Sequence, residues 1–162
     1  MVSPPHFDHE KLDVYQLELK FLTWVTQFLA DLSGPSLAQT RELREQLDRA
    51  SLSALLNTAE GNGRRQGRQR AKFFDDARGS AIECAACLDA SVAKGFVFLE
   101  RIQSGKEMLV RIVAMLSKLV VRFDPEQYRV GESASGLAAP FENEDDDEHE
   151  DEIENPRKKT TF

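Results

Sequence analysis

Apolar residues recur every three to four positions over most of the chain, the spacing that places them on one face of an α-helix. The pattern falls into four stretches, at about 8–32, 37–60, 68–94 and 104–123, and no stretch shows the alternation of a half-buried strand. Four such helices joined by short loops favour an up-down-up-down arrangement. The sequence therefore predicts an all-α fold, an antiparallel four-helix bundle over residues 8–123.

Residues that disfavour helix continuation separate the four stretches. Ser33–Pro35 ends the first stretch, and Asp124–Pro125 ends the fourth. Gly61 and Gly63 are predicted to end the second stretch, because glycine readily adopts the left-handed conformation of a helix C-terminal cap. Gly95 is predicted to end the third.

The predicted start of the fourth helix rests on a capping box. Ser104 and Glu107 have the spacing at which each side chain satisfies a backbone N–H at the other's position. The preceding residues 96–103, FVFLERIQ, fit both a helix and a short extended segment. We therefore predict that the fourth helix begins near Ser104.

Charge is distributed unevenly along the 162 residues. Residues 131–162 hold eleven acidic and three basic residues, whereas residues 1–130 hold 17 acids and 18 bases. The net charge of −7 at pH 7 therefore describes the C-terminal part and not the helical part. Such a composition buries too little apolar surface to offset the entropy of ordering, so residues 124–162 are predicted to be a disordered, acidic low-complexity tail.

Neither a membrane span nor a secretory signal is visible in the sequence. No stretch reaches the roughly 18 apolar residues of a membrane span, and the first residues lack the apolar core of a signal peptide. Two cysteines, Cys84 and Cys87, do not make a disulfide framework. These features predict a cytoplasmic protein that does not enter a membrane.

The residues that usually carry catalysis or bind metals do not converge in the helical part. The three histidines, His6, His9 and His149, lie near the ends of the chain, so general acid–base catalysis lacks its usual agent. Cys84 and Cys87 resemble a redox or half-zinc motif, but they lie mid-helix without further zinc ligands. We predict core packing for this pair, no metal or cofactor, and a protein that is not an enzyme.

The first stretch carries two apolar stripes, more than a helix of a monomeric bundle needs. The stripe predicted to face the core consists of Leu12, Tyr15, Leu19, Leu22 and Leu29. The stripe predicted to form an interface between subunits consists of Val14, Phe21, Val25 and Phe28. Because such a surplus typically marks a second buried surface, we expect self-association. Alternatively, the two stripes merge into one wide core face.

A cluster of bases interrupts the helical pattern between the second and third stretches. The sequence AEGNGRRQGRQRAKFF, residues 59–74, contains Arg64, Arg65, Arg68, Arg70 and Lys72. Its glycines lack the spacing of a dinucleotide-binding loop, and the Gly-Lys-Ser/Thr of a P-loop is absent. Arginine binds phosphate oxygens with two parallel hydrogen bonds, and the start of a helix adds free N–H groups. We predict that these five residues bind nucleic acid; the alternative is a solvated charged loop.

Two segments resemble a known family. FDHEKLDVYQ and the run from Arg44 to Glu83 resemble the four-helix-bundle proteins called 23S rRNA-intervening-sequence proteins, and the resemblance covers about Phe7–Phe123. Its most specific positions are Gln46, Arg49, Asn57–Gly61, Phe74, Ala77, Gly79, Ser80 and Glu83. The acidic tail is not part of it.

The resemblance implies an antiparallel bundle that assembles as a homopentameric ring. Family members are encoded inside insertions in ribosomal RNA genes. The family is also similar to the accessory proteins of diversity-generating retroelements, pentamers that bind a reverse transcriptase and its RNA through a basic surface. No catalytic activity is implied. The positions to which the resemblance gives roles in loop structure and helix packing are Asn57, Glu60, Gly61, Gly79, Ser80 and Glu83.

Two functions follow as hypotheses. The first is a non-enzymatic, ring-forming bundle that binds RNA, or a ribonucleoprotein partner such as a reverse transcriptase with its RNA. The second is a protein–protein adaptor without nucleic-acid binding, in which the bases are only solvated. The predicted topology also places the loop after Glu60 and the exit after Phe123 at the same end of the bundle. The acidic tail is therefore predicted to compete with RNA for the loop; the alternative is a tail that only aids solubility.

Overall fold

The computed structural model of the protein describes residues 7–32 and 37–126, so the predicted tail from residue 127 onward lies outside the described part. A short 3₁₀ helix precedes four α-helices. These elements are η1 (Asp8–Lys11), α1 (Asp13–Asp31), α2 (Leu37–Gly63), α3 (Gly67–Ala93) and α4 (Leu99–Phe123). The described residues contain no strand, which confirms the predicted all-α class.

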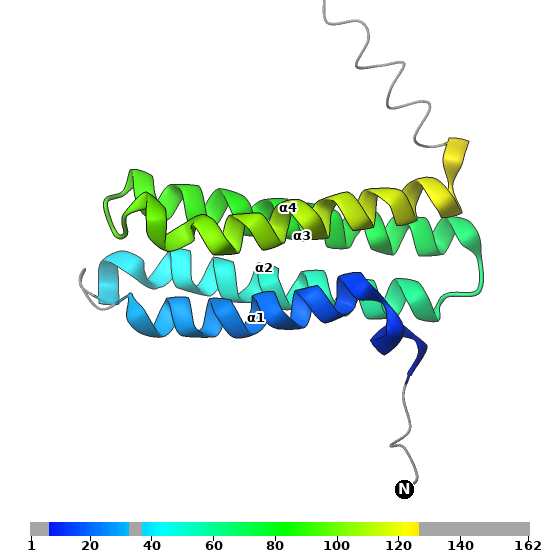
Figure 1. The fold of residues 1–162 in the computed structure, drawn as a ribbon, viewed down its shortest axis with the longest axis horizontal. Coiled ribbons are helices and arrows are strands. Elements are labelled where there is room, and N and C mark those ends of the chain that lie inside the picture. The colour runs from blue at the N-terminus through cyan, green and yellow to red at the C-terminus, as the bar shows by residue number, and fades with distance from the viewer. Residues whose placement is uncertain (1–6, 33–36, 127–162) are drawn as a thin grey trace, which may run out of the picture.

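The four helices form an up-down-up-down bundle in which each helix is antiparallel to its two neighbours (Figure 1). The contacts between α1 and α4 illustrate the direction. Asp31 pairs with Arg101, whereas Trp24 lies against Gly105, so residue numbers rise along α1 as they fall along α4. The α2–α3 loop therefore lies at one end of the bundle and the α3–α4 loop at the other (Figure 1).

Large apolar side chains from all four helices fill the core. Phe28, Leu47, Phe74 and Leu116 are each at most 1% exposed, and burial of a side chain of this size stabilises the fold by roughly 1.5–3 kcal/mol. The contact between α2 and α3 is the most extensive among the described elements, and it includes small residues. The side-chain oxygens of Ser53 and Ser80, for example, are 3.0 Å apart.

The two apolar stripes of α1 have the opposite positions from those predicted, since the stripe assigned to a subunit interface faces the core of the single chain. Val14, Phe21, Val25 and Phe28 are at most 3% exposed and belong to the core of a single chain. They have no free surface for a second subunit, so the predicted interface is wrong.

The stripe of α1 predicted to face the core is the more exposed one. Leu19 is 37% exposed, and Leu12, Tyr15, Leu22 and Leu29 are half-buried. Helical periodicity identifies two apolar faces but not the rotation of the helix about its axis. Contacts with other helices set that rotation, such as the Trp24 indole against Gly105 of α4.

Gly61 and Gly63 do not end α2 as left-handed caps. The helix continues through Gly63, and Gly95 is the only glycine with a positive φ among the described residues. Gly61 instead permits close packing, because a Cβ at this position would lie 3.0 Å from the Cβ of Phe73 and 3.2 Å from the ring of Phe74. The glycine is therefore required by its neighbours on α3 and not by a turn.

Gly95 does follow the end of α3, with a φ of 70°. Its N–H donates to the carbonyl of Val92, and the N–H of Phe96 donates to the carbonyl of Ser91, both at 2.9 Å. These two bonds form the Schellman motif that satisfies the last carbonyls of a helix.

The fourth helix begins earlier than predicted. Its first residue is Leu99, directly after the short turn that Gly95 opens, and Ser104 lies inside the helix. The predicted capping box is therefore wrong, and the ambiguous stretch 96–103 divides into a loop and the first turns of α4.

Candidate nucleic-acid interface

The α2–α3 loop and the end of α4 lie against each other at one end of the bundle (Figure 1). Gly67, the first residue of α3, permits this contact, since a Cβ at this position would lie 3.0 Å from the carbonyl oxygen of Phe123. The Phe123 ring also packs against Phe74, with ring centroids 5.8 Å apart. The five predicted bases, which we call the basic loop, lie on this loop and the first turns of α3. They are Arg64, Arg65, Arg68, Arg70 and Lys72.

Arg64 is held by contacts with both helices that the loop connects. It forms an ion pair with Glu60, one turn earlier on α2. Its guanidinium group lies 4.8 Å from the centre of the Phe73 ring on α3. A cation–π contact at a partly exposed site is worth about 0.5–1 kcal/mol, so Arg64 helps to fix the loop.

Arg70 joins the loop to the end of α4. It donates a hydrogen bond to Oδ1 of Asn62 at 2.9 Å, and its guanidinium lies 4.2 Å from the centre of the Phe123 ring. Its Nε is buried and has no hydrogen-bond partner among the described residues. Much of this side chain is therefore committed to packing.

Arg64 is 43% exposed, and the other three bases carry the rest of the exposed charge. The side chains of Arg65 and Lys72 are exposed and make no ion pair or hydrogen bond with another described residue. The side chain of Arg68 is 81% exposed and lies 3.9 Å from Asp124 and 3.6 Å from Glu126. The pair with Glu126 is exposed on both sides and contributes little to stability, whereas the Asp124 side chain is only 11% exposed. The guanidinium group of Arg68 itself is open to solvent, so all three bases are available to a phosphate group.

The start of α3 adds to the positive potential at this place. Gln66, its N-cap residue, makes no side-chain hydrogen bond to the first turn. The first N–H groups of a helix have no acceptor within it and carry a partial positive charge. An anion beside Arg65 and Arg68 would therefore also meet backbone N–H groups.

Arg122, in the last turn of α4, is a further base that sequence analysis missed. It is exposed, and its guanidinium lies 5.7 Å from the centre of the Phe123 ring. Because it is distant from the basic loop in sequence, only the topology indicates that it lies at the same end.

Acidic residues limit the extent of this basic surface. Asp8 and Glu10 belong to η1, which packs against α2 near the same end (Figure 1). Asp8 pairs with Lys11 at 3.0 Å, and Glu10 accepts the N–H of Phe7 at 3.0 Å. The positive charge is thus concentrated on the α2–α3 loop and the start of α3.

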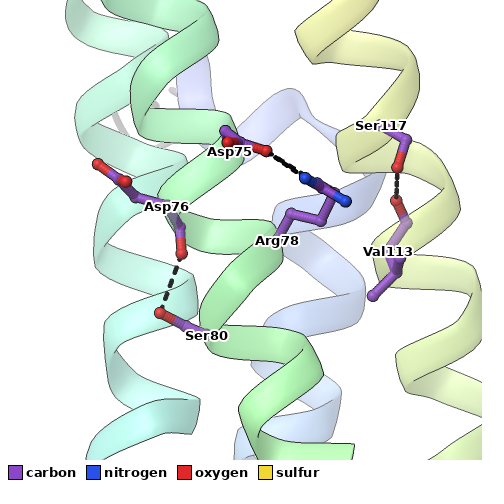
Figure 2. Close-up of polar contacts among 6 residues, drawn as sticks. All are labelled: Asp75, Asp76, Arg78, Ser80, Val113 and Ser117. Carbon is purple, nitrogen blue, oxygen red and sulfur yellow. Dashed lines mark hydrogen bonds and ion pairs between the residues drawn. The ribbon is translucent and has the colours of Figure 1, made fainter. Parts of the chain in front are cut away.

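Polar residues of the family resemblance line the seam between α2 and α3. The hydroxyl of Ser80 donates to the carbonyl of Asp76 at 3.0 Å (Figure 2), so its oxygen accepts the proton of Ser53. Ser53 in turn accepts a hydrogen bond from the amide of Asn57 at 3.2 Å. This chain of hydrogen bonds ties the two helices together at mid-length.

A second polar network lies on the same seam, farther from the basic loop. Arg49 donates to Oε1 of Gln46 at 3.0 Å, and the Gln46 amide donates to Glu83. Gln46 and Glu83 also line a groove of about 320 Å³ between the helices, together with Cys87. The contacts of Gln46, Arg49 and Glu83 thus hold α2 to α3.

Gly79 differs from these residues because no other side chain of the described residues packs against it. It is exposed in the middle of α3, and a Cβ at this position would have no neighbour within 4 Å. An exposed glycine inside a helix costs about 1 kcal/mol relative to alanine, so the packing of the single chain gives no reason for this residue.

The side chains of Arg78 on α3 and Ser117 on α4 each bond within their own helix (Figure 2). Arg78 donates to Oδ1 of Asp75 at 2.6 and 2.9 Å, and the hydroxyl of Ser117 donates to the carbonyl of Val113 at 2.8 Å. Because Arg78 is paired locally, it does not extend the basic loop along α3.

Two groups buried between the helices, Glu18 and Cys84, have strongly raised pKa values. Glu18 is 3% exposed, its Oε1 accepts a hydrogen bond from Thr58 at 2.8 Å, and burial raises its pKa from 4.5 to about 8. Burial, together with the neighbouring Cys87 and Glu83, raises the pKa of Cys84 to about 12. The Cys84 thiol is therefore protonated at neutral pH and packs in the core, as predicted.

The described residues contain no group of three or more His, Cys, Asp or Glu side chains that is arranged to hold a metal ion. Within the same part of the chain, no helix is both long and apolar enough to cross a membrane.

These features define a class of protein, an all-helical four-helix bundle with a basic loop at one end. A family model described as 23S rRNA-intervening sequence protein matches residues 10–118, more than half of the chain. The chain therefore belongs to the 23S rRNA-intervening sequence protein family, which confirms the resemblance seen in the sequence. No curated protein matches the chain.

Proposed function

We propose that this protein is a non-enzymatic bundle that binds RNA through the basic loop and assembles as a homo-oligomer. The observation that carries the first part is the set of three exposed bases, Arg65, Arg68 and Lys72, beside the N-terminus of α3. Guanidinium, ammonium and helix N–H groups together form the chemistry that binds phosphate. The family description, which refers to an intervening sequence of 23S rRNA, supports RNA as the polyanion.

The RNA interface is tested with a triple alanine variant of Arg65, Arg68 and Lys72. Each contact with a phosphate releases counterions, so the loss of three contacts should weaken binding by about one to two orders of magnitude at moderate salt. The readout is the fluorescence anisotropy of a labelled single-stranded RNA. Because the three side chains are exposed, the thermal unfolding midpoint should not change.

The matched control removes three bases from the other end of the bundle, Arg41, Lys94 and Lys106. It has the same net charge as the loop variant but an intact basic loop. We expect it to bind RNA nearly as tightly as the parent protein. Equal losses in the two variants would contradict a local interface, and absence of binding by the parent protein would contradict RNA binding itself.

The proposed assembly is a ring, with five chains as the family resemblance implies. Since the α1 stripe is buried, the interface must use another face, and we place it on the outer side of α2 and α3. Leu52 and Leu56 are 45% and 57% exposed one turn apart on α2. The Ser53–Ser80 contact brings this part of α2 to the level of Gly79. Close approach of a second chain would account for that exposed glycine.

The assembly is tested by light scattering on the double variant L52D/L56D and on G79L. The parent protein should have a mass several times that of the 18.3 kDa chain, and both variants should dissociate while they remain helical. The matched control is V110D, which alters an exposed apolar residue of α4, outside the proposed face. A parent mass of one chain would refute the assembly, and oligomeric variants would refute this choice of face.

A protein–protein adaptor is the second candidate, and one surface favours it. Phe98 and Leu99, at the start of α4, are 85% and 65% exposed at the end of the bundle opposite the basic loop. A groove of about 260 Å³ beside them is lined by residues that include Phe28, Phe96 and Arg101. Exposed apolar surface next to a groove is typical of protein contacts. If the variant F98S lost a protein partner while RNA binding failed in the parent protein, the adaptor would be the better description.

A further inference from the structure

The described chain ends on the surface proposed to bind RNA. Asp124 and Glu126 follow the last turn of α4 and lie 3.9 and 3.6 Å from the guanidinium group of Arg68. Gly67 approaches the backbone of Phe123 closely, so the start of α3 and the end of α4 lie side by side. The residues after Glu126 therefore start within contact distance of the basic loop.

The sequence that continues from this point has the opposite charge. Residues 131–162 hold eleven acids and three bases, and five consecutive acids occupy positions 144–148. The basic loop holds five bases, of which Arg65, Arg68 and Lys72 are exposed and not held by an aromatic ring. At physiological ionic strength attraction between exposed charges fades beyond about 8 Å. The acidic segment starts beside the basic loop, so its carboxylates can come close enough to the loop bases for their opposite charges to attract.

We propose that the acidic segment after Glu126 occupies the basic loop in competition with RNA, so that the chain carries its own competitor. The carboxylates take the positions of RNA phosphates on Arg65, Arg68 and Lys72. The pairing of Arg68 with Asp124 and Glu126 is the first part of this contact, already present in the described residues. The inference rests on the proposed function and adds its regulation.

The length of the connection permits this contact. Residues 127–143 lie between Glu126 and the five consecutive acids, and seventeen residues span at most about 60 Å when fully extended. A connection this short gives a tethered segment an effective concentration in the millimolar range. Against a weak polyanion contact with a dissociation constant of about 0.1 mM, a millimolar competitor lowers the apparent RNA affinity about tenfold.

The test removes the negative charge of the acidic segment in two ways, the first of which keeps the full chain. One variant carries E144Q, D145N, D146N, D147N and E148Q, and a second ends after Val130. Each is also made with the loop bases Arg65, Arg68 and Lys72 replaced by alanine. A labelled single-stranded RNA is titrated at about 50 and about 200 mM salt. We expect both tail variants to bind about tenfold more tightly than the parent at the lower salt, with a smaller difference at the higher salt.

The loop variants separate the possible outcomes. When the loop bases are removed, the tail changes should no longer alter RNA affinity. If tail and loop act independently, so that neutral and acidic tails still differ after removal of the loop bases, the proposal is wrong. The tail variants could instead bind RNA no more tightly than the parent, while the loop variant still loses affinity. That result would refute competition by the tail but leave the proposed function intact. Failure of every form to bind RNA would instead refute the proposed function.

Discussion

The buried carboxyl of Glu18 should make the stability of the bundle fall as the pH rises. Its pKa is raised from 4.5 to about 8 because burial disfavours the charged form, while the hydrogen bond from Thr58 acts in the opposite direction. The folded state therefore holds a proton that the unfolded state releases above pH 4.5. The free energy of unfolding is highest below pH 4.5 and decreases until the folded state also ionises, near pH 8.

The size of this effect follows from the two pKa values. Each pKa unit corresponds to about 1.4 kcal/mol, so the difference between 4.5 and about 8 amounts to about 5 kcal/mol in all. At pH 7 about 3 kcal/mol of this should already be lost. The variant E18Q places a neutral side chain of the same shape next to Thr58 and should remove this contribution to the pH dependence.

The assay is urea unfolding followed by circular dichroism, for the parent and E18Q, from about pH 5 to about pH 8. Protein concentration is held constant because assembly would also stabilise the folded chain. Other groups titrate in both proteins, so the difference between the two curves isolates Glu18. We expect the parent to lose about 3 kcal/mol relative to E18Q across this range. Parallel curves would mean that Glu18 is ionised in the folded protein, and the argument from burial would fail.

Two further predictions concern packing. A Cβ at Gly105 would lie 2.5 Å from the Trp24 ring, so G105A should lower the free energy of unfolding by about 1–3 kcal/mol. The control G63A should change it little, because a Cβ at Gly63 would meet no described atom within 4 Å. Equal thermal unfolding midpoints for the two variants would refute this reading of Gly105. Arg70 packs on Phe123 and donates a hydrogen bond to Asn62. R70A should therefore lower the thermal unfolding midpoint by several degrees, which corresponds to a loss of about 1 kcal/mol, while R65A should leave the midpoint unchanged. If R65A destabilised the protein as much as R70A, the division of the basic loop into packed and exposed bases would be wrong.

The sequence predicted the helices better than their faces. Four periodic stretches sufficed for the number and order of the helices, because an amphipathic period needs only local information. Both stripes of α1 are apolar, and the choice between them depends on partners distant in sequence. Trp24 fits against Gly105 of α4, and Glu18 bonds Thr58 of α2. Neither contact leaves a signal within the first stretch itself.

The helix ends show a similar limit. Glycine at the end of a helical stretch has two explanations, a left-handed turn or close packing. Gly95 is the first case, and Gly61, against Phe73 and Phe74, is the second. The pattern of Ser104 and Glu107 fitted a capping box locally, but the Schellman turn at Gly95 is compact enough for α4 to begin at Leu99.

The candidate site was predicted as a list of bases and not as an arrangement. All five bases of the basic loop were visible from sequence alone. Their division into packed and exposed bases was not predicted, because it depends on contacts of Arg64 with the ring of Phe73 and of Arg70 with the ring of Phe123. Phe123 lies on α4, far from the loop in sequence. Arg122 was missed for the same reason.

The most direct test of the central claim is the salt dependence of RNA binding. Each phosphate neutralised on single-stranded RNA contributes about 0.7 to the slope of log affinity against log salt concentration. If Arg65, Arg68 and Lys72 each contact one phosphate, their triple alanine variant should have a slope smaller by about 2 than that of the parent. The control that lacks Arg41, Lys94 and Lys106 should keep the parental slope. An unchanged slope in the loop variant, or the same reduction in both variants, would contradict the claim that the basic loop is the RNA-binding surface.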